Sequence, residues 1–303
     1  MKTTFLAGFA LAASALAVTG AQAQANDTLK KIKDSGSITM GVRESSGALA
    51  FTLGDGKYAG FHYDVCQRVI ADIQKQLGMA KIDIKYQPVT SQNRIPLVQN
   101  GTVDIECGST TNNTARLKDV AFAPALYVEE VRIAVKANSG INNIAALNGK
   151  TVATTTGTTS VQLLRKNKRA QGMDFKELNG KDHSDSFLLL ESGRADAFVM
   201  DGQILAGLIS KSKNPADFKI VGEPLSVEPI AIMYRKDDPA FKKAVDDSVR
   251  NLAKSGEVAK LYDKWFMQPI PPANTRVNLP PSDATKAAWA NPSDKPLEEY
   301  AQP

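Results

Sequence analysis

Hydrophobic positions along this chain alternate between two spacings, and the alternation predicts strands and helices in turn. Residues 37–42 form an apolar run that predicts a buried strand. Apolar side chains then recur every fourth residue from Val65 to Leu77, which predicts a helix over residues 63–77 that ends at Gly78. Further strands are predicted at 82–89 and 103–106, a hairpin at 51–61 and a short helix at 94–99. This β-α-β-α-β order is typical of a mainly parallel sheet in an α/β protein.

A second unit of the same kind begins near Val131. Strands are predicted at residues 149–153, 195–200 and 220–221, and helices at 161–167 and 184–191. The run LVQNGTVDI from Leu97 is echoed by LLESGRADA from Leu189, and both are read as helix, glycine cap and strand. The echo suggests two lobes with a similar plan. A strand at 231–234 and helices at 239–254 and 257–266 follow, and then a Pro-rich tail with one helix at 282–290, anchored by Trp289.

The first 23 residues have the pattern of an export signal. A basic start is followed by an Ala-rich apolar stretch at residues 5–18, which is too short to anchor the chain across a bilayer. Small residues at alternate positions predict cleavage after Ala23, with Ala25 as the second choice. No cysteine follows the stretch, and no later segment is apolar for 18 residues. We therefore expect a mature protein in the periplasm, without a lipid anchor.

Charge and cysteine content narrow the class of protein. The formal net charge of +5 is a mild excess of cations spread among acidic residues, and no basic patch with interleaved aromatic residues predicts a nucleic-acid surface. Cys66 lies on the apolar face of the helix predicted at 63–77, and Cys107 ends a strand. Disulfides persist in exported proteins, so the pair is either a bridge or two buried free thiols.

Polar side chains gather on loops that follow buried elements, which is how a rigid scaffold presents donors to a small anion. Ser91 and Arg94 lie on one such loop, Ser109 and Thr111 lie on a second, and Arg116 follows it. Residues 158–160 directly precede the helix predicted at 161–167, where free N–H groups and hydroxyls form another anion site or simply cap the helix. No nucleophile–base pair and no cluster of metal ligands accompanies them. The pattern indicates capture of a small carboxylate without a cofactor or a metal.

Several uncommon runs carry a resemblance to a known family. They are TSQNRIPL at residues 90–97, ECGSTTNN at 106–113, GTTS at 157–160, KDH at 181–183, ESGRA at 191–195 and KWF at 264–266. Almost the whole mature chain resembles the glutamate/aspartate-binding proteins of bacterial amino-acid ABC transporters. The resemblance implies a two-lobed periplasmic-binding-protein (Venus-flytrap) fold of type II, with crossover strands near residues 126–132 and 225–230. Lobe 1 would hold residues 26–126 and 231–303, and residues 127–230 would form the crossovers and lobe 2.

The resemblance also implies a role for each candidate residue. The ligand's side-chain carboxylate is assigned to Arg43, Ser91, Arg94 and His183. Its α-carboxylate is assigned to Arg116, Thr159 and the backbone around Ser109 and Thr111, and its ammonium to Asp201 and acceptors of the same loop. One carboxylate for the ammonium, and three arginines plus a histidine for two carboxylates, favour a dicarboxylic amino acid, because a neutral ligand would leave buried charge unpaired. His62 is expected to be structural.

Alternatives to transport remain open at this point. An enzyme on the same scaffold, similar to a dehydratase, would use Glu44 or Glu106 as its acid, and a sensory or adhesive role would use the same binding site. Gly202 and Gln203 after Asp201, and GALA at residues 47–50, depart from the family's usual pattern and bear on fine selectivity. The expected partners are L-glutamate or L-aspartate and a membrane permease, with the protein itself a monomer.

Overall fold

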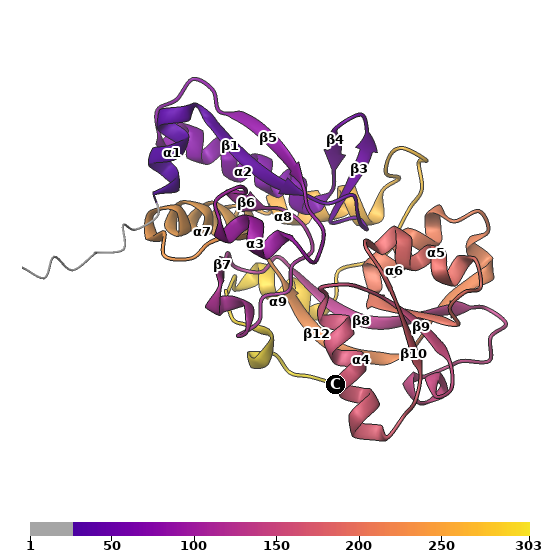
Figure 1. The fold of residues 1–303 in the computed structure, drawn as a ribbon. Helices are drawn as coiled ribbons and strands as arrows, with labels where there is room; N and C mark the ends of the chain where they lie inside the picture. Colours follow the sequence, from indigo (N-terminus) through magenta and orange to yellow (C-terminus); the bar gives the residue numbers. More distant parts are fainter. Residues whose placement is uncertain (1–26) are drawn as a thin grey trace, which may run out of the picture.

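The computed structural model describes residues 27–303 of the chain, which form two lobes joined by a pair of strands (Figure 1). The expected signal peptide, residues 1–23, lies outside the described residues. In the part of the chain that is described, no helix is both long and apolar enough to cross a membrane. Each lobe has a five-stranded sheet of its own, with helices packed on it. The expected two-lobed α/β architecture is therefore confirmed.

Lobe 1 is built on the sheet order β5-β1-β6-β13-β7. Its strands are β5 (Asp83–Pro88), β1 (Ser37–Val42), β6 (Ile105–Glu106), β13 (Met233–Arg235) and β7 (Val120–Phe122). β5, β1 and β6 are parallel, and β13 runs against its neighbours. Helices of this lobe are α1 (Thr28–Ser35), α2 (Phe61–Gln76), α3 (Arg94–Gln99), α7 (Pro239–Lys254) and α8 (Glu257–Tyr262). Because β13, α7 and α8 come late in the sequence, the chain must enter lobe 1 twice.

Lobe 2 is built on the sheet order β10-β9-β11-β8-β12. Three parallel strands, β10 (Lys176–Gly180), β9 (Thr151–Thr155) and β11 (Ala197–Asp201), are flanked by the antiparallel pair β8 (Tyr127–Lys136) and β12 (Phe218–Ile230). Its helices are α4 (Thr159–Gln171), α5 (His183–Glu191) and α6 (Gly202–Lys211). Each of these helices begins within four residues of the end of a parallel strand. Their N-termini consequently lie at one edge of the sheet, the edge nearest lobe 1 (Figure 1).

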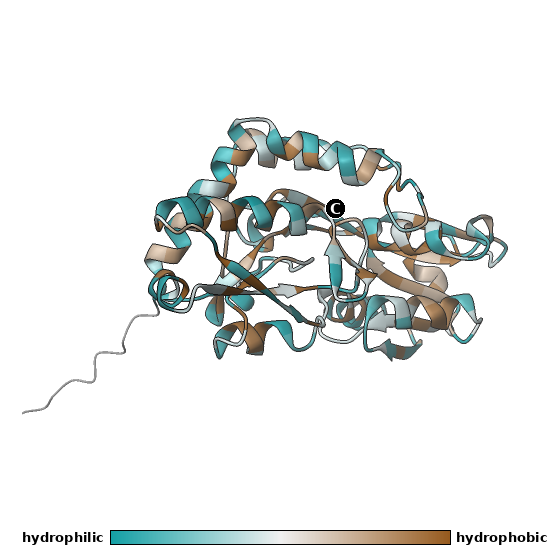
Figure 2. Ribbon diagram, turned by 90° about the horizontal axis from the view of Figure 1, so that it is seen from above, coloured by the Kyte–Doolittle hydropathy of each residue, from teal (hydrophilic) through white to brown (hydrophobic). Residues whose placement is uncertain are grey.

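Alternation along the strands explains why lobe 2 has helices on both faces of its sheet. Val131, Ile133 and Val135 of β8 belong to one buried cluster with Leu164 of α4, whereas Ala134 belongs to another that includes helix α6. Successive side chains of a strand point to opposite faces, so an unbroken apolar run requires cover on both. Figure 2 shows the result: hydrophobic residues follow the strands, and the outer faces of the helices are hydrophilic.

The paired strands β8 and β12 form the connection between the lobes. They pair in register from Tyr127↔Ile230 onward, with one irregularity between Val221 and Ser226. Tyr127 and Ile230 belong to the core of lobe 1, and the other ends of both strands belong to the sheet of lobe 2. The two connections of the chain are thus bonded to each other along their length and form one hinge.

A small sheet and the C-terminal tail complete lobe 1. Strands β2 (Ser45–Ser46), β3 (Ala50–Gly54) and β4 (Lys57–Ala59) form a three-stranded sheet that faces α5 and α6 of lobe 2. The tail carries α9 (Asp283–Ala290), whose Trp289 donates a hydrogen bond to the carbonyl of Leu126, 2.7 Å away, and packs on Tyr262. The tail therefore braces the start of the hinge.

Most predicted elements are present, and the differences have local causes. The short strand predicted at residues 220–221 and the crossover strand expected near 225–230 are parts of one longer strand, because β12 runs from Phe218 through two prolines to Ile230. Pro229 is accommodated in the outermost strand of the sheet, where one face of the backbone needs no partner strand. The helix predicted at 257–266 ends at Tyr262 and widens into a π-helical turn over Asp263–Met267. Helices α1 and α6 and strand β10 were not predicted.

Cys66 of α2 and Cys107, the residue after β6, are bonded to each other, so the described residues contain no free cysteine. The bridge ties the helix layer of lobe 1 to the strand that leads into residues 108–113. It closes a loop with a sequence separation of 41 residues.

Replacing both cysteines by alanine (Cys66→Ala with Cys107→Ala) should lower the free energy of unfolding by about 4 kcal/mol, because the unfolded chain regains the entropy of the open loop. Urea unfolding followed by circular dichroism measures the change. Reduction of the wild-type protein with dithiothreitol should give the same loss, and should have no effect on the double variant. A double variant as stable as the oxidised protein would contradict this account.

Candidate functional site

A small cavity lies between the lobes, beside the ends of the parallel strands of lobe 2. Polar side chains from both lobes form most of its wall. The residues of the wall are Ser91, Arg94, Ser109 and Thr111 from lobe 1, and Thr158, Thr159, His183, Met200 and Asp201 from lobe 2. All nine predicted ligand residues except Arg43 and Arg116 line this cavity. Those two arginines do not line the cavity but donate hydrogen bonds to residues that do, Arg43 to Ser91 and Arg116 to Thr111.

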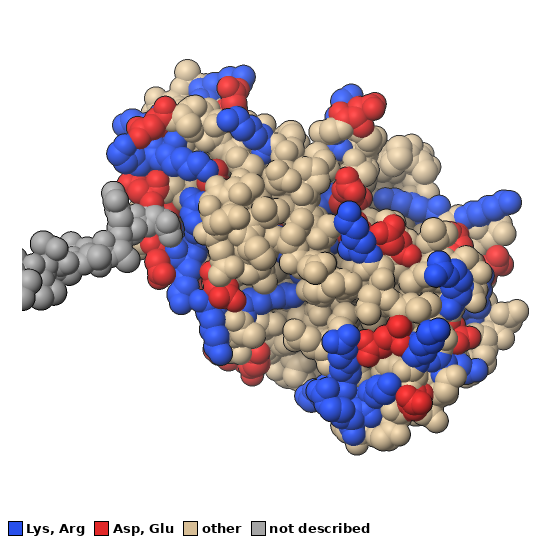
Figure 3. All heavy atoms as spheres, viewed as in Figure 1, with Lys and Arg blue, Asp and Glu red and all other residues tan. Residues whose placement is uncertain are grey.

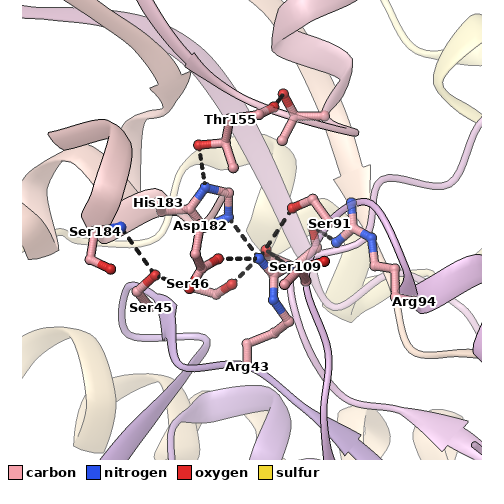
Figure 4. Close-up of polar contacts among 12 residues, drawn as sticks. Arg43, Ser45, Ser46, Ser91, Arg94, Ser109, Thr155, Asp182, His183 and Ser184 are labelled. Atoms are coloured by element: carbon pink, nitrogen blue, oxygen red, sulfur yellow. Dashed lines mark hydrogen bonds and ion pairs between the residues drawn. The ribbon is translucent and has the colours of Figure 1, made fainter. Parts of the chain in front are cut away.

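Arg43 follows β1 and is completely buried at one end of the cavity (Figure 4). Its Nη2 lies 3.1 Å from each of three atoms: Ser91 Oγ, Asp182 Oδ1 and His183 Nε2. Because a guanidinium only donates, Nε2 of His183 must accept, and its Nδ1–H therefore donates to Thr155 Oγ1 at 3.0 Å. Burial, with Arg43 next to it, lowers the pKa of His183 to about 3. His183 is thus neutral at physiological pH.

Arg94, the first residue of α3, is the least compensated cation of the site. Its Nη1 donates to the carbonyl of Ser109 at 3.1 Å, and its Nε is buried without a hydrogen-bond partner. Burial lowers the pKa of Arg94 well below its usual value, and the nearby charges of Arg116 and Arg43 lower it further. A buried guanidinium in these surroundings favours an anion in the cavity beside it.

Asp201, the last residue of β11, is the carboxylate of the cavity wall. It is 5% exposed, and none of the described residues donates a hydrogen bond to its side chain. Burial raises the pKa of Asp201 to about 7, the neighbouring carboxylate Glu228 raises it too, and the nearby arginines oppose both. The cavity thus has a cationic wall and a carboxylate without a partner.

Arg116 links the lobes at the cavity's edge. Its Nη1 donates to the carbonyl of Thr111 at 2.8 Å, and its Nη2 donates to the carbonyl of Gly157, in lobe 2, at 3.3 Å. Arg116 lines a more open groove outside the cavity, together with Ser91 and Gly157. Its guanidinium is close enough to act on charges in the cavity but does not form its wall.

Two functional residues were missed in the sequence. Asp182 caps α5 and pairs with Arg43 across the lobes, and it also accepts from Ser45 Oγ at 2.5 Å. Glu228 of β12 accepts hydrogen bonds from Thr111 and Thr159. The signal for such residues was the charge count itself: three arginines in one buried site require more than one acid among their neighbours.

Contacts between the lobes show that the cleft is closed. In addition to the Arg43–Asp182 pair, Gln203 of α6 accepts from the backbone N–H of Ala48 at 3.1 Å and donates to the carbonyl of Ser46 at 3.3 Å. Gly157 touches the backbone of Gln92 so closely that an added Cβ would lie 2.7 Å from the Cα of Gln92. Ligand exchange therefore requires the lobes to move apart.

The acids considered for catalysis lie outside the cavity wall. Glu44 is exposed on the loop after β1, and Glu106 is buried behind Gly108, where it accepts from Thr110 Oγ1 at 2.7 Å. Residues 27–303 contain no group of three or more histidines, cysteines or acids placed to hold a metal ion. The chemistry available in the cavity is therefore charge pairing and hydrogen bonding.

Two α/β lobes that close around a charged cavity on a two-stranded hinge define the class of solute-binding proteins. The chain belongs to the bacterial extracellular solute-binding proteins, family 3, whose model matches residues 38–268.

Relatives and solved structures agree with this family. The chain is 44% identical over 295 residues to the glutamate/aspartate import solute-binding protein of Escherichia coli K12, covering 95% of this chain and 98% of the relative. It is 46% identical over 274 residues to the L-glutamate/L-aspartate-binding protein of Pseudomonas aeruginosa, covering 90% of each. Its fold is similar to an ancestral arginine-binding protein bound to arginine, with a TM-score of 0.67 and 30% identity, covering 76% and 98%. These relatives are transport proteins and not enzymes.

His62, expected to be structural, supports the site from behind. It is buried in α2, and its Nδ1 lies 2.7 Å from the carbonyl of Gly108, the residue before Ser109. Burial lowers the pKa of His62 to about 4, against an opposing contribution from this hydrogen bond.

An acid-sensitive stability should follow from His62. Its pKa is lower in the folded than in the unfolded protein, so the unfolded chain takes up a proton first as the pH falls. The contribution is fully present above pH 6.5 and is lost progressively down to about pH 4; between pH 7 and 4.5 we expect a loss of about 2.5 kcal/mol. Urea unfolding of the wild type and of His62→Gln at both pH values measures it. Equal losses in the two proteins would exclude His62 as the source.

Proposed function

We propose that the protein captures L-glutamate and L-aspartate in the periplasm and delivers them to the permease of an ABC transporter. The observation that carries the proposal is the charge arrangement of the closed cavity. Arg94 of lobe 1, whose buried Nε has no hydrogen-bond partner, and Asp201 of lobe 2, whose carboxylate has none among the described residues, line the same cavity. A ligand with a carboxylate for the first and an ammonium for the second would satisfy both. The Escherichia coli and Pseudomonas aeruginosa relatives are named for the same two ligands.

The residues around Arg43 are proposed to bind the ligand's side-chain carboxylate. Ser91, Arg94 and His183 line this part of the wall, and Arg43 lies behind them. Because Asp182 already pairs with Arg43, the uncompensated positive charge here is close to that of one arginine. One carboxylate would neutralise it, which favours an acidic over a neutral side chain.

The α-amino acid group is assigned to the rest of the wall. Thr159 lies in the first turn of α4, where a hydroxyl and free N–H groups suit an α-carboxylate. Arg116 would reach the same carboxylate from the cavity's edge, and Asp201 would accept from the ammonium together with acceptors around Ser109 and Thr111. Each ionisable side chain of the described wall is thereby assigned to one charged group of the ligand, Asp201 to the ammonium, so we infer binding without turnover.

The rest of the transport cycle is proposed from the fold and the sequence. The signal peptide would be removed after Ala23 on export. Lobe 1 would comprise residues 26–126 and 231–303, and residues 127–230 would supply the crossovers and lobe 2. On the face seen in Figure 3, positive and negative side chains are interspersed, as suits a protein that acts as a monomer and binds no nucleic acid. Closure on the ligand would create the surface that the permease recognises.

Isothermal titration of the ligand-stripped protein tests the proposed ligands directly. L-Glutamate and L-aspartate should bind tightly, and L-glutamine and L-histidine weakly or not at all, because neither offers a second carboxylate to Arg94. Tight binding of a neutral or basic amino acid alone would refute the assignment.

Arg94→Met should separate ligand binding from stability. Losing the buried guanidinium removes the carboxylate's principal partner, so affinity for L-glutamate should fall about 100-fold or more. The free energy of unfolding without ligand should stay within about 1 kcal/mol or rise, because the replaced cation lacks full compensation. Titration calorimetry and urea unfolding measure the two effects. Unchanged affinity would remove Arg94 from the site.

Gly157→Ala should hinder closure of the cleft. Gly157 has a φ of +83°, and an added Cβ would meet the backbone of residues 91–92 across the lobes, so affinity for L-glutamate should fall about tenfold or more. Gly140→Ala is the matched control in lobe 2: its φ is +74°, and nothing lies within 4 Å of an added Cβ. Both variants should lose about 1 kcal/mol of stability, and only Gly157→Ala should lose affinity. Equal affinities would mean that this contact does not form on binding.

A further inference from the structure

Glu228 is a buried carboxylate on the hinge that holds one hydroxyl from each lobe. It is 1% exposed. Its Oε2 accepts from Thr111 Oγ1 of lobe 1 and from Thr159 Oγ1 of lobe 2, each at 2.7 Å, and its Oε1 accepts from Ser226 Oγ at 2.8 Å. Among the described residues none forms a salt bridge with Glu228. Its hydrogen-bond partners among the described residues are therefore three neutral hydroxyls, and Arg116 is the cation close enough to interact with it electrostatically.

Asp201 brings a second carboxylate to the same part of the cleft. It lines the cavity together with Thr111 and Thr159, the two residues whose hydroxyls are bonded to Glu228. The side chain of Asp201 is nine-tenths buried and accepts no hydrogen bond from residues 27–303. The charge of Glu228 is close enough to raise the pKa of Asp201, because like charges near each other raise each other's cost of ionisation.

We propose that Glu228 is a further residue of the ligand site, which pairs with Asp201 so that the lobes close only when an ammonium or a proton neutralises one of the two charges. The proposal rests on the proposed function, because it takes the ammonium to be that of an acidic amino acid. Glu228 acts as a positioning residue: it aims the hydroxyls of Thr111 and Thr159 and sets the charge opposite Asp201.

The other charged groups near Asp201 decide which one titrates. Arg43 after β1, Arg94 of α3 and Arg116 of the turn after Ala115 favour its ionised form, and burial and Glu228 of β12 oppose it. From β8, Tyr127 and Glu129 also face Asp201, and burial raises the pKa of both well above their usual values. We therefore expect Asp201, whose pKa burial raises to about 7, to change charge between pH 6 and 8 in the closed cleft, while His183 stays neutral.

Two ligands that differ only in the ammonium test the proposal. L-Glutamate brings its own cation, so its affinity should be nearly the same at pH 6 and pH 8. Glutarate has both carboxylates but no amine, so closure around it is favoured by a proton on Asp201. Burial raises the pKa of Asp201 to about 7 in the closed cleft, and we expect water to restore its usual pKa once the lobes part, so glutarate should bind about tenfold more tightly at pH 6 than at pH 8.

Glu228→Gln tests the part played by this residue. Without the charge of Glu228, Asp201 ionises more readily in the closed cleft, so the tenfold pH effect on glutarate should shrink toward one. The preference for L-glutamate over glutarate at pH 8 should shrink with it. A merely structural loss would weaken both ligands by the same factor and leave these ratios unchanged. Glu130→Gln is the matched control, because it removes a half-exposed carboxylate of β8 that pairs with Arg132 and should keep the wild-type ratios.

Each outcome of the titration series decides something. Equal glutarate affinities at pH 6 and 8 in the wild type, or no measurable glutarate binding at pH 6, would overturn the carboxylate pair while leaving the proposed function intact. If Glu228→Gln keeps the wild-type pH dependence for glutarate and the wild-type preference for L-glutamate, Glu228 is not part of the carboxylate pair. Failure of L-glutamate to bind at either pH would overturn the proposed function and this inference together. If Glu228→Gln does not fold, Asp201→Asn decides on the pair, since it should bind glutarate equally at both pH values.

Discussion

Charge burial in the closed cleft is the constraint on which the rest of this structure depends. Arg43 and Arg94 are almost fully buried, and so are Asp201 and Glu228. Taking an ion out of water costs several kcal/mol unless it finds a partner. The cleft supplies partners unevenly, since Arg43 has Asp182 whereas Arg94 and Asp201 have no ionic partner among the described side chains. A ligand that brings a negative charge to Arg94 and a positive charge to Asp201 would therefore have a large effect on the free energy of closure.

One of the buried charges, that of Glu228, lies on the hinge strands that join the two lobes. β8 and β12 pair with each other and continue into the sheet of lobe 2, so lobe 2 moves with them as one body. Glu228 lies on β12 at the level of the cavity and accepts a hydroxyl from each lobe. A change of charge at the ligand site is therefore felt directly by the strands about which the lobes turn. A conformational change can be driven only by contacts that differ between its two states, and the contacts of Glu228 join residues of the two lobes.

The fold was more predictable from the sequence than the site was. Helices with a regular apolar stripe and a clear start or stop, such as Arg94–Gln99 and Pro239–Lys254, were predicted with their observed bounds. Strand β12 was not, because its prolines and glycine resemble a loop unless pairing with β8 is known. For the site, loops after buried strands pointed to donors, and the resemblance supplied their roles. Asp182 and Glu228 were missed because an acid that serves buried partners looks, in one sequence, like any acid on a surface.

Two segments that depart from the family's usual pattern, Gly202–Gln203 and residues 47–50, are in contact in the structure. Gln203 lies two residues after Asp201 in lobe 2, and residues 47–49 form the turn that leads into β3 at Ala50 in lobe 1. The side chain of Gln203 bonds to the backbone on both sides of Gly47, and a Cβ on Gly47 would lie 2.2 Å from its Oε1. Gly207, one turn further along α6, leaves room for the same turn, with Gly47 Cα 3.2 Å from the position of an added Cβ. Each departure is therefore accommodated by the other, and together they form a latch between the lobes outside the ligand cavity. Their effect falls on the energy of closure, which is common to every ligand, more than on the choice between ligands.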